Sequence, residues 1–586
     1  MPQEPSRASS GQALTVGAIA AALAVAVPAL VLVGAAPMPT LMTDLLALAG
    51  WGLFIALIAV HSSAWRQTPI ASAGLRALFL LLGGMVVIAV GSAALASGPP
   101  RIVVRDVGML LTACAVLAAG ARLMQPANHG ELRHIQLISV LLLAFVCAGG
   151  LNAVVAITQY LAPGSTWAPL NVEGRAVGHM RQPNHLATQL LWAYAALVAL
   201  HEIRRFPIWL FAAFCTLLLV ALAMSASRTG VLACIVLASW GVLDRRLSTQ
   251  SRIALVGAPI LLVLGWWALA ASAPAVGQAF GGTALLNKAD PTSSRWGLWQ
   301  QTLRLIEQNP WLGVGWGQFN FAWTLTPMEP IVRSGGHTFS HAHNLFLHWA
   351  AEIGVPLALL ATGLLGLALW RAVVGARQAS GIEAPLRSGA LAMLGVVLMH
   401  SLFEFPLWHA NFLLPAVFLF GIALGKGAEP AVAARTFASA SPTLTGGLIV
   451  LAAVVVFHAY QPISHLYHPP EDGATEQARI DSARQSPLFG HFGDRFAGTL
   501  AAPGSRRLEP YREIVFEHLD VQLLMSWSQA YAEAGQLAHA HYLAMRLKEL
   551  TQPGAQRFFE VCDTPLSLNF YQCSQPRSGI GFRDFR

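Results

Sequence analysis

Apolar runs long enough to cross a membrane recur along most of the chain, separated by short polar segments. A bilayer core about 30 Å thick is spanned by a helix of about 20 apolar residues. Thirteen runs meet or approach this length, which predicts an all-α polytopic membrane helix bundle of about 13 spans. These runs centre on residues 14–34, 41–60, 77–96, 107–121, 136–160, 184–201, 207–224, 229–243, 253–272, 344–370, 388–404, 409–425 and 443–461.

Two features of this pattern affect how the chain divides. The tenth run is open to a break into two helices near Pro356. The long segment 273–342 interrupts the runs, so residues 1–461 are predicted to form a membrane domain with one large loop. The first run has no convincing small-residue cleavage site and is interpreted as a retained span.

The pattern changes after residue 461, and residues 462–586 are predicted to form a small helical C-terminal domain. Val521–Ala534, Gly535 and Leu537–Leu550 indicate a helix–Gly–helix hairpin of tetratricopeptide character. Because one such unit cannot bury its apolar face alone, this domain is either a helical cap packed on loop 273–342 or a module that docks an acceptor.

Composition supports the same division. Charged residues make up 11% of the chain, about 8% of residues 1–461 and about 21% of residues 462–586. A typical soluble domain has about 25%. This excludes a soluble enzyme and a disordered chain, and the dispersed Arg residues of the net +8 charge exclude a nucleic-acid partner.

The distribution of Lys and Arg gives an orientation. With the N-terminus in the cytoplasm, fifteen basic residues lie on the cytoplasmic side and five lie in short outer loops, as the positive-inside rule requires. Loop 273–342 and the tail then lie outside. Cys562 and Cys573 are expected to form a disulfide there, stabilising by roughly 3 kcal/mol.

Polar side chains gather where the runs meet this outer face, and ionisable groups at membrane depth are candidates for function. The first cluster comprises Arg175, His179, Arg181, Gln182, Pro183, Asn184 and His185. A helix start at Pro183 with interfacial arginines is one interpretation, but the cluster holds more polar groups than a cap needs.

Two further clusters are candidates for anion binding. Ser225–Gly230 is either a tight hairpin with Ser/Thr capping or, through Arg228 beside a helix N-terminus, an anion site. An amphipathic stretch follows Ser294 and contains Arg295. The glycines Gly313, Gly315 and Gly317 lack the Lys-Ser/Thr ending of a phosphate loop and are interpreted as permitting a tight turn.

A histidine-rich segment runs from His337 to Gly354 and includes His341, His343, Asn344 and His348. The spacing His341-x-His343, with no matching carboxylate pair, is not a recognised zinc motif, so no metal is predicted. His348 and Glu352 share a helix face at i,i+4. Further on, Glu404 is a candidate general base, an Arg partner or a purely structural ion-pair residue.

Taken together, these clusters place arginines, histidines and carboxylates on one rim. Arg side chains suit phosphate oxygens, and His suits proton transfer near neutral pH. An apolar flank beside such a rim would suit a lipid-linked pyrophosphate.

The motifs Gln182-Pro-Asn-His185, Ser225-x-Ser-Arg-Thr-Gly230, Arg295…Gly313-x-Gly315 and His343-Asn344…Glu352-x-Gly354 resemble the O-antigen ligase/polymerase superfamily (Wzy/WaaL type). The first motif and the tail look most like its protein O-oligosaccharyltransferase branch (PglL type). This resemblance implies a GT-C glycosyltransferase of the bacterial inner membrane, with its active face and C-terminus in the periplasm.

The resemblance also implies the chemistry. Members take a glycan from undecaprenyl pyrophosphate, and no cofactor or metal is implied. A Ser or Thr hydroxyl of an acceptor protein would attack the anomeric carbon with inversion. His343 would act on its proton, and Arg228 and Arg295 would stabilise the departing pyrophosphate. The expected substrate-binding residues are Arg175, Arg181, Gln182, Asn184, His185, His341, Asn344 and Glu404.

Other functions remain open at this stage. Lipid A core as acceptor would make the protein an O-antigen ligase, and extension of the repeat unit would make it a polymerase. A transporter should show internal repeats and broken helices at a midplane site, which this sequence does not indicate. A structural scaffold would not concentrate Arg and His at one rim.

Overall fold

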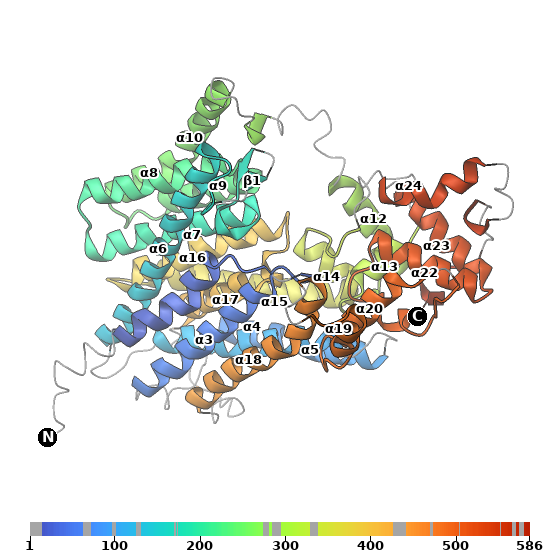
Figure 1. The fold of residues 1–586 in the computed structure, drawn as a ribbon. Coiled ribbons are helices and arrows are strands. Elements are labelled where there is room, and N and C mark those ends of the chain that lie inside the picture. The colour runs from blue at the N-terminus through green and yellow to red at the C-terminus, as the bar shows by residue number, and fades with distance from the viewer. Residues whose placement is uncertain are drawn as a thin grey trace. The chain divides into compact units, whose positions relative to one another are not determined.

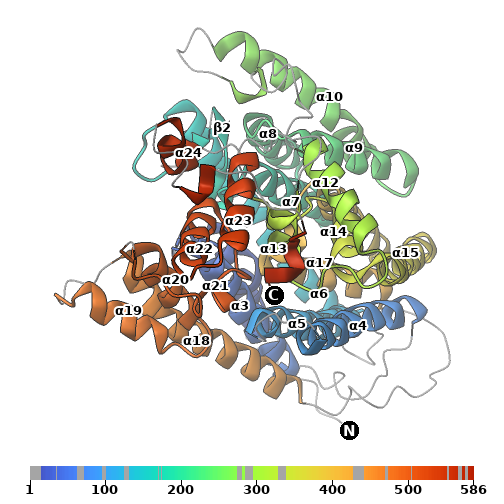
Figure 2. The same cartoon turned by 90° about the vertical axis from the view of Figure 1, so that its right-hand side faces the viewer.

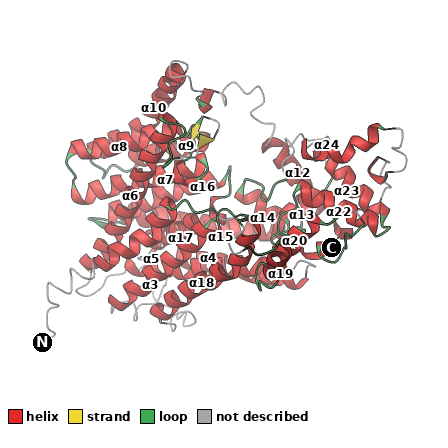
Figure 3. Cartoon of the chain, viewed as in Figure 1, coloured by secondary structure: helices red, strands yellow, loops and turns green. Residues whose placement is uncertain are grey.

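A computed structural model describes most of the chain, and the described residues are almost entirely helical (Figure 3). A two-stranded antiparallel hairpin of β1 (Asn171–Val172) and β2 (Arg175–Ala176) is the exception among them. The described residues are 15–34, 36–61, 72–95, 101–124, 131–168, 171–172, 174–273, 280–283, 295–327, 338–425, 441–468, 473–502, 504–550, 553–564, 570–573 and 579–585.

The helices bear out a polytopic membrane bundle. Within the described residues, seven helices are long and apolar enough to cross a membrane, and five shorter apolar helices accompany them. Each of the thirteen predicted runs overlaps a helix. The seven long helices are α4 (Ala73–Leu95), α5 (Arg101–Leu123), α6 (Glu131–Leu161), α7 (Pro183–Arg204), α10 (Thr249–Ser272), α15 (Val355–Gln378) and α18 (Pro442–Tyr467).

The chain folds into two compact units, and the predicted membrane and C-terminal domains stay a prediction. The first comprises residues 1–83, 109–289 and 363–455. The second comprises residues 84–108, 290–362 and 456–586. The second unit thus combines the tail with most of the large loop and with the loop-side ends of α4, α5, α15 and α18.

The first unit contains most of the membrane helices (Figure 1). Besides those already given, its elements are η1 (Ala22–Ala26), α2 (Val27–Leu30), α3 (Leu41–His61), η3 (Gly178–Met180), α8 (Ile208–Met224), α9 (Arg228–Leu243), α16 (Glu383–Ser401), η5 (Pro406–Trp408) and α17 (Ala410–Leu424).

Helix α7 is the centre of this unit and packs against α6, α8, α9 and α16. Two buried aromatic side chains fasten it to its neighbours. Trp192 Nε1 donates to the Met393 carbonyl at 2.8 Å, and the Tyr194 hydroxyl donates to the Ala254 carbonyl at 2.8 Å. Small residues allow α6 to approach closely, because a Cβ at Gly149 would lie 2.2 Å from the Ala193 Cβ. The central position of α7 fixes the residues at its N-terminus.

The second unit is built from short helices of the loop and the tail. The loop contributes α12 (Arg295–Gln308) and α13 (Phe319–Leu325), and the start of the tenth predicted span contributes α14 (Leu345–Ile353). The tail contributes α19 (Glu476–Arg484), α20 (Gly490–Leu500), α21 (Tyr511–Ile514), α22 (Val521–Glu533), α23 (Leu537–Leu550), α24 (Pro553–Phe559), η6 (Glu560–Asp563), η8 (Tyr571–Cys573) and η9 (Phe582–Phe585).

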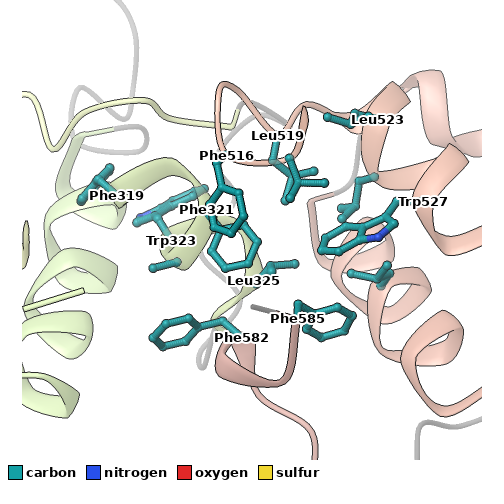
Figure 4. Packing of buried hydrophobic residues seen from close by; sticks show 14 of the residues in the cluster. Phe319, Phe321, Trp323, Leu325, Phe516, Leu519, Leu523, Trp527, Phe582 and Phe585 are labelled. Carbon is teal, nitrogen blue, oxygen red and sulfur yellow. The ribbon is translucent and has the colours of Figure 1, made fainter. Parts of the chain in front are cut away.

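Loop and tail share one hydrophobic core, in which side chains of the two segments interleave (Figure 4). Phe321 of the loop lies 4.6 Å from Phe516 of the tail, centroid to centroid. Both views of the chain show the loop helices beside the tail helices (Figure 2). Two buried polar side chains reinforce the contact: Tyr542 donates to the Leu325 carbonyl at 2.5 Å, and Arg546 donates to the Thr324 carbonyl at 2.9 Å. The tail therefore packs on the loop, and its role as a cap or as a module that docks an acceptor stays a prediction.

Two local predictions also hold. The hairpin forms as α22 and α23, with Gly535 in the left-handed region at φ 74° between them. The tenth predicted span is two helices, α14 and α15, and they are separated at Gly354 rather than at Pro356. Helix α18 extends past residue 461 and continues through Pro462 to Tyr467.

Candidate active site

The first polar cluster forms the start of α7. Gln182 is the N-cap, and its Oε1 accepts from the His185 amide at 2.8 Å. Pro183 follows as the first helical residue, where its missing N–H is not needed. Asn184 and His185 therefore project from the first turn of a helix whose position the bundle fixes.

Two amide side chains of α6 hold the segment that leads into this turn. Gln159 Oε1 accepts from the Val177 and Gly178 amides at 3.1 and 2.8 Å, and its Nε2 donates to the Gly178 carbonyl at 3.0 Å. Asn152, two turns earlier on the same face, accepts from the His179 amide at 2.9 Å. Both side chains are buried. Sequence reasoning missed them, although two amides seven residues apart within an apolar span were a usable signal.

The same segment is tied to the N-terminal part of the chain. His179 Nδ1 lies 2.6 Å from the Leu30 carbonyl, and Arg181 donates to the Pro39 carbonyl. Arg181 occupies the left-handed region at φ 61°. These contacts give His179 and Arg181 a local structural role in the described residues, in addition to any role toward a substrate.

Three of the sequence motifs meet at Asn184. Its Nδ2 donates to Glu404 Oε1 at 3.1 Å, and its Oδ1 accepts from the Ser227 hydroxyl at 2.7 Å. Ser227 is also the N-cap of α9, where its Oγ accepts from the Gly230 amide at 3.0 Å. Glu404 is buried in the turn between α16 and α17. One chain of hydrogen bonds therefore links the N-terminus of α7, the N-terminus of α9 and the buried Glu404 carboxylate.

The two arginines beside this junction differ in their surroundings. Arg175 donates from Nε to the Ser225 carbonyl at 3.1 Å and from Nη2 to the Ala226 carbonyl at 3.4 Å. It thereby caps the end of α8 and holds Ala226, which has φ 48°. Arg228, the first residue of α9, is exposed and has no hydrogen-bond or ion-pair partner among the described residues. Of the two arginines beside this junction, Arg228 is the one that remains available for an anion.

Histidines surround the same junction. The His185 ring lies 5.6 Å from that of His400 and 5.1 Å from that of His409, centroid to centroid. His400 Nδ1 and the Thr188 hydroxyl are hydrogen-bonded at 2.8 Å. Across the part of the chain that the structure describes, no three His, Cys, Asp or Glu side chains are arranged to hold a metal ion. Thr188 and His400 of this cluster are buried within the bundle, and His185 and His409 are half-buried.

The second unit holds the histidine-rich segment. His348 Nε2 lies 3.5 Å from Glu352 Oε2, and both side chains are buried on one face of α14, as the i,i+4 spacing predicted. His348 Nδ1 accepts from the Ala342 amide at 3.3 Å, and Glu352 Oε1 accepts from the Phe319 amide at 3.1 Å. His348 of this pair therefore connects α14 to Ala342, the residue between His341 and His343.

His343 lies immediately before this helix in a constrained conformation. It has φ 52°, a region that L-residues seldom adopt. Asn344, which follows it, is the N-cap of α14 and accepts from the Phe346 and Leu347 amides at 3.1 and 3.0 Å. On its other side, the Ala342 carbonyl accepts from Trp299 Nε1 of α12 at 3.0 Å. Both neighbours of His343 are thus held by hydrogen bonds.

Arg295 begins the helix that provides this Trp299 contact. It lies four residues before Trp299 on α12, which places Arg295 in the same unit as His341, His343 and Asn344. Arg175, Arg181, Gln182, Asn184, His185, Arg228 and Glu404 belong to the other unit. The predicted site residues thus fall into two sets, each of which is organised within its own unit.

The predicted glycine turn packs on the end of α14. The Val314 amide donates to the Ala351 carbonyl at 2.8 Å, and the Gly315 amide donates to the Glu352 carbonyl at 3.0 Å. A Cβ at Gly313 would lie 2.4 Å from the Glu352 backbone. Gly313 also has φ 68°. The close approach of two backbones therefore requires glycine here, in agreement with the tight turn inferred from the sequence.

One ion pair joins the tail to the beginning of α5 within the second unit, and a second pair lies within the tail. Arg101 pairs with Glu513, and His491 Nε2 lies 3.5 Å from Glu517 Oε2. Burial acts to raise the pKa of Glu517, but the nearby His491 imidazole and the charge of Arg105 outweigh it and hold the pKa below the ordinary 4.5. Cys562 and Cys573 form a disulfide in the same tail.

Comparison with known proteins places family signatures over these same segments. Residues 213–362 match a family model described as O-antigen ligase, and residues 176–201 match one described as protein glycosylation ligase. Residues 389–540 match a model described as virulence factor membrane-bound polymerase, C-terminal. The first match includes Arg228, Arg295 and His343, and the second includes Gln182 to His185. These matches, each over a part of the chain, agree with the superfamily and branch that the motifs resemble.

Two curated proteins of Acinetobacter baylyi are similar to parts of the chain. A general O-oligosaccharyltransferase is 28% identical over 262 residues, which is 42% of this chain and 43% of the relative. A ComP-specific O-oligosaccharyltransferase is 25% identical over 254 residues, 42% of this chain and 44% of the relative. The chain spans less than half the length of the curated relatives that it matches.

Proposed function

From the O-antigen ligase and protein glycosylation ligase segments that this chain carries, we propose that it is a protein O-oligosaccharyltransferase. It would move an oligosaccharide from undecaprenyl pyrophosphate to Ser or Thr hydroxyls of periplasmic proteins. The observation that carries this proposal is the junction at Asn184. There the glycosylation-ligase segment, through Asn184, is hydrogen-bonded to Ser227, the residue before Arg228 in the ligase segment.

The proposed reaction is an inverting glycosyl transfer. The acceptor oxygen forms a bond to the anomeric carbon as the bond from that carbon to the pyrophosphate oxygen breaks. The hydroxyl proton passes to His343, and the electron pair leaves with undecaprenyl pyrophosphate. A positioned His typically contributes about 10²–10⁴-fold through proton transfer. The constrained backbone of His343, held on both sides, supports this role.

The arginines would stabilise the charge that develops on the leaving group. Arg228 is exposed beside the N-terminus of α9, where amide N–H groups and a guanidinium both favour an anion. Arg295 is assigned the same role in the other unit. Arg181, Arg175, Gln182, Asn184, His185, His341, Asn344 and Glu404 are assigned to substrate binding, with the hydrogen bonds above supporting a positioning role for Asn184 and Glu404.

We also propose a multi-pass GT-C arrangement of about thirteen spans, and contacts of the second unit support its placing of the loop and the tail on one side. The pair Arg101–Glu513 brings the tail to the start of α5. Ser92, near the end of α4, accepts from the Trp316 amide at 2.9 Å. The tail and the loop therefore meet the ends of membrane helices that the charge distribution assigns to the outer side. We place that side in the periplasm of a bacterial inner membrane, where the disulfide would be stable.

A reconstituted transfer assay tests the proposal. Purified protein in liposomes would receive an undecaprenyl-pyrophosphate-linked oligosaccharide, with a pilin-like protein and lipid A core offered in separate reactions. Glycosylated protein is the expected product. Modified lipid A core alone would identify an O-antigen ligase, the alternative favoured by the match over residues 213–362. Elongated lipid-linked glycan alone would identify a polymerase, and either result would overturn the proposal.

A further inference from the structure

The turn between α12 and α13 presents the two most exposed large hydrophobic side chains among the described residues. Trp311 is 74% exposed and Leu312 is 78% exposed. They are adjacent in sequence and lie between Asn309 and Gly313. A large apolar pair at this exposure is unusual on a surface that faces water.

This exposure is not a consequence of a loose backbone. The Gly313 amide donates to the Asn309 carbonyl at 3.1 Å, and the Val355 amide donates to the Pro310 carbonyl at 2.8 Å. Gly354 lies so close that a Cβ there would be 2.3 Å from the Trp311 carbonyl oxygen. The turn is therefore held rigidly, with both side chains directed outward.

The residue that holds the turn is the first residue of a membrane-spanning helix. Val355 begins α15, one of the seven helices long and apolar enough to cross a bilayer. Leu359 and Leu360, one turn into α15, are 66% and 59% exposed. Exposed leucines at the start of such a helix face lipid, so the Trp311–Leu312 turn lies beside the point where α15 enters the membrane.

We propose that Trp311 and Leu312 insert into the lipid interface of the leaflet in which α15 begins. Trp is enriched at this level of the bilayer because its ring is apolar and its N–H is polar. The same turn contacts the end of α14 through Val314 and Gly315. The insertion would thus set the height of α14, and of His343 before it, above the bilayer. This contact rests on the membrane-spanning character of α15 and not on the proposed reaction.

Spin-label accessibility in lipid nanodiscs tests the insertion. The full chain, with Cys114, Cys147, Cys215 and Cys234 each replaced by Ala and the disulfide retained, would carry one added cysteine. The sites are Trp311→Cys, Leu359→Cys as the lipid-facing reference, and Glu307→Cys as the aqueous reference, since Glu307 is an exposed charged residue on α12. Nanodiscs of phosphatidylethanolamine and phosphatidylglycerol would hold the protein, and labels would be exposed to oxygen and to a water-soluble nickel chelate.

The expected result is a several-fold higher ratio of oxygen to nickel accessibility at position 311 than at position 307, approaching that at position 359. A ratio at 311 equal to that at 307 would show that the turn lies in water and would overturn the proposal. Low accessibility to both reagents at 311 would show a protein partner or a second copy on the turn, and would overturn it equally.

Discussion

The Ser227 hydroxyl donates to Asn184 Oδ1 at 2.7 Å, which joins two helix N-termini that lie 43 residues apart in the chain. The NH2 of the same Asn184 amide, through Nδ2, donates to Glu404 Oε1 at 3.1 Å. A single side chain with one donor group and one acceptor thus connects a hydroxyl and a carboxylate.

Replacement of this amide tests its importance. Asn184→Asp would place a second carboxylate against Glu404, and like charges at this distance repel. We expect transfer to fall by about 10- to 100-fold, in line with the loss of a buried hydrogen bond to a charged group. In the double variant Asn184→Asp/Glu404→Gln, the new amide at position 404 would donate to the new carboxylate at position 184, so one donor again faces one acceptor. It should recover most of the activity measured as initial transfer rate.

The double variant also separates this interpretation from a simple structural defect. If Asn184→Asp and the double variant are equally inactive although both are folded, the hydrogen bond is not what Asn184 contributes. Thermal unfolding of each variant in detergent would establish that it is folded.

His343→Ala should lower the transfer rate by about 10²–10⁴-fold, since the variant loses the group proposed to accept the proton. Binding of the lipid-linked donor should change little. The rate would be measured with saturating donor, and donor affinity by titration. His458→Ala is the matched control, because His458 is exposed on α18. Full activity in His343→Ala would rule out the proposed base.

Gly313→Ala should destabilise the second unit by about 1–3 kcal/mol, because the new Cβ would meet the Glu352 backbone and φ is positive. The control is Gly363→Ala on α15, where no described atom lies within 4 Å of the added Cβ. That change should be neutral or slightly stabilising. Rates of limited proteolysis of the loop and tail measure the difference, and equal rates in both variants would contradict the role assigned to the turn.

Acid should weaken the attachment of the tail. The pKa of Glu517 is held below 4.5 in the folded protein, so its ionised form contributes stability that is present above about pH 4.5. This contribution is lost as the pH falls through the folded pKa. The unfolding midpoint of the full chain should drop more steeply between pH 5 and pH 3 than that of Glu517→Gln, in buffers spaced by about half a pH unit. Glu509→Gln, at an exposed carboxylate, should follow the unchanged protein.

The sequence predicted the helices well because their signals are local. Apolar length indicated the spans, Pro183 marked the start of α7, and Gly535 marked the hairpin of the tail. The i,i+4 spacing of His348 and Glu352 was likewise sufficient to pair them. Each of these features depends on residues within a few turns of one another.

The contacts that organise the candidate site were not predictable in the same way. Asn184, Ser227 and Glu404 were identified from three separate motifs, but their hydrogen bonds depend on the packing of α7 against its neighbours. Asn152 and Gln159 were overlooked because an amide within an apolar span has no partner in its own helix, and its partners at 177–179 are visible only in the fold. The proposed catalytic roles of His343, Arg228 and Arg295 stay predictions.

The shared core of loop and tail has a consequence for protein engineering. Residues 295–327 and 511–585 bury their aromatic side chains against each other, so neither segment is a free-standing part that can be exchanged alone. A chimera built to transplant acceptor preference from a relative should carry both segments as one cassette. A grafted tail alone would not pack against the loop side chains of the shared core. The resulting misfolding would lower transfer in the same way as a loss of acceptor recognition.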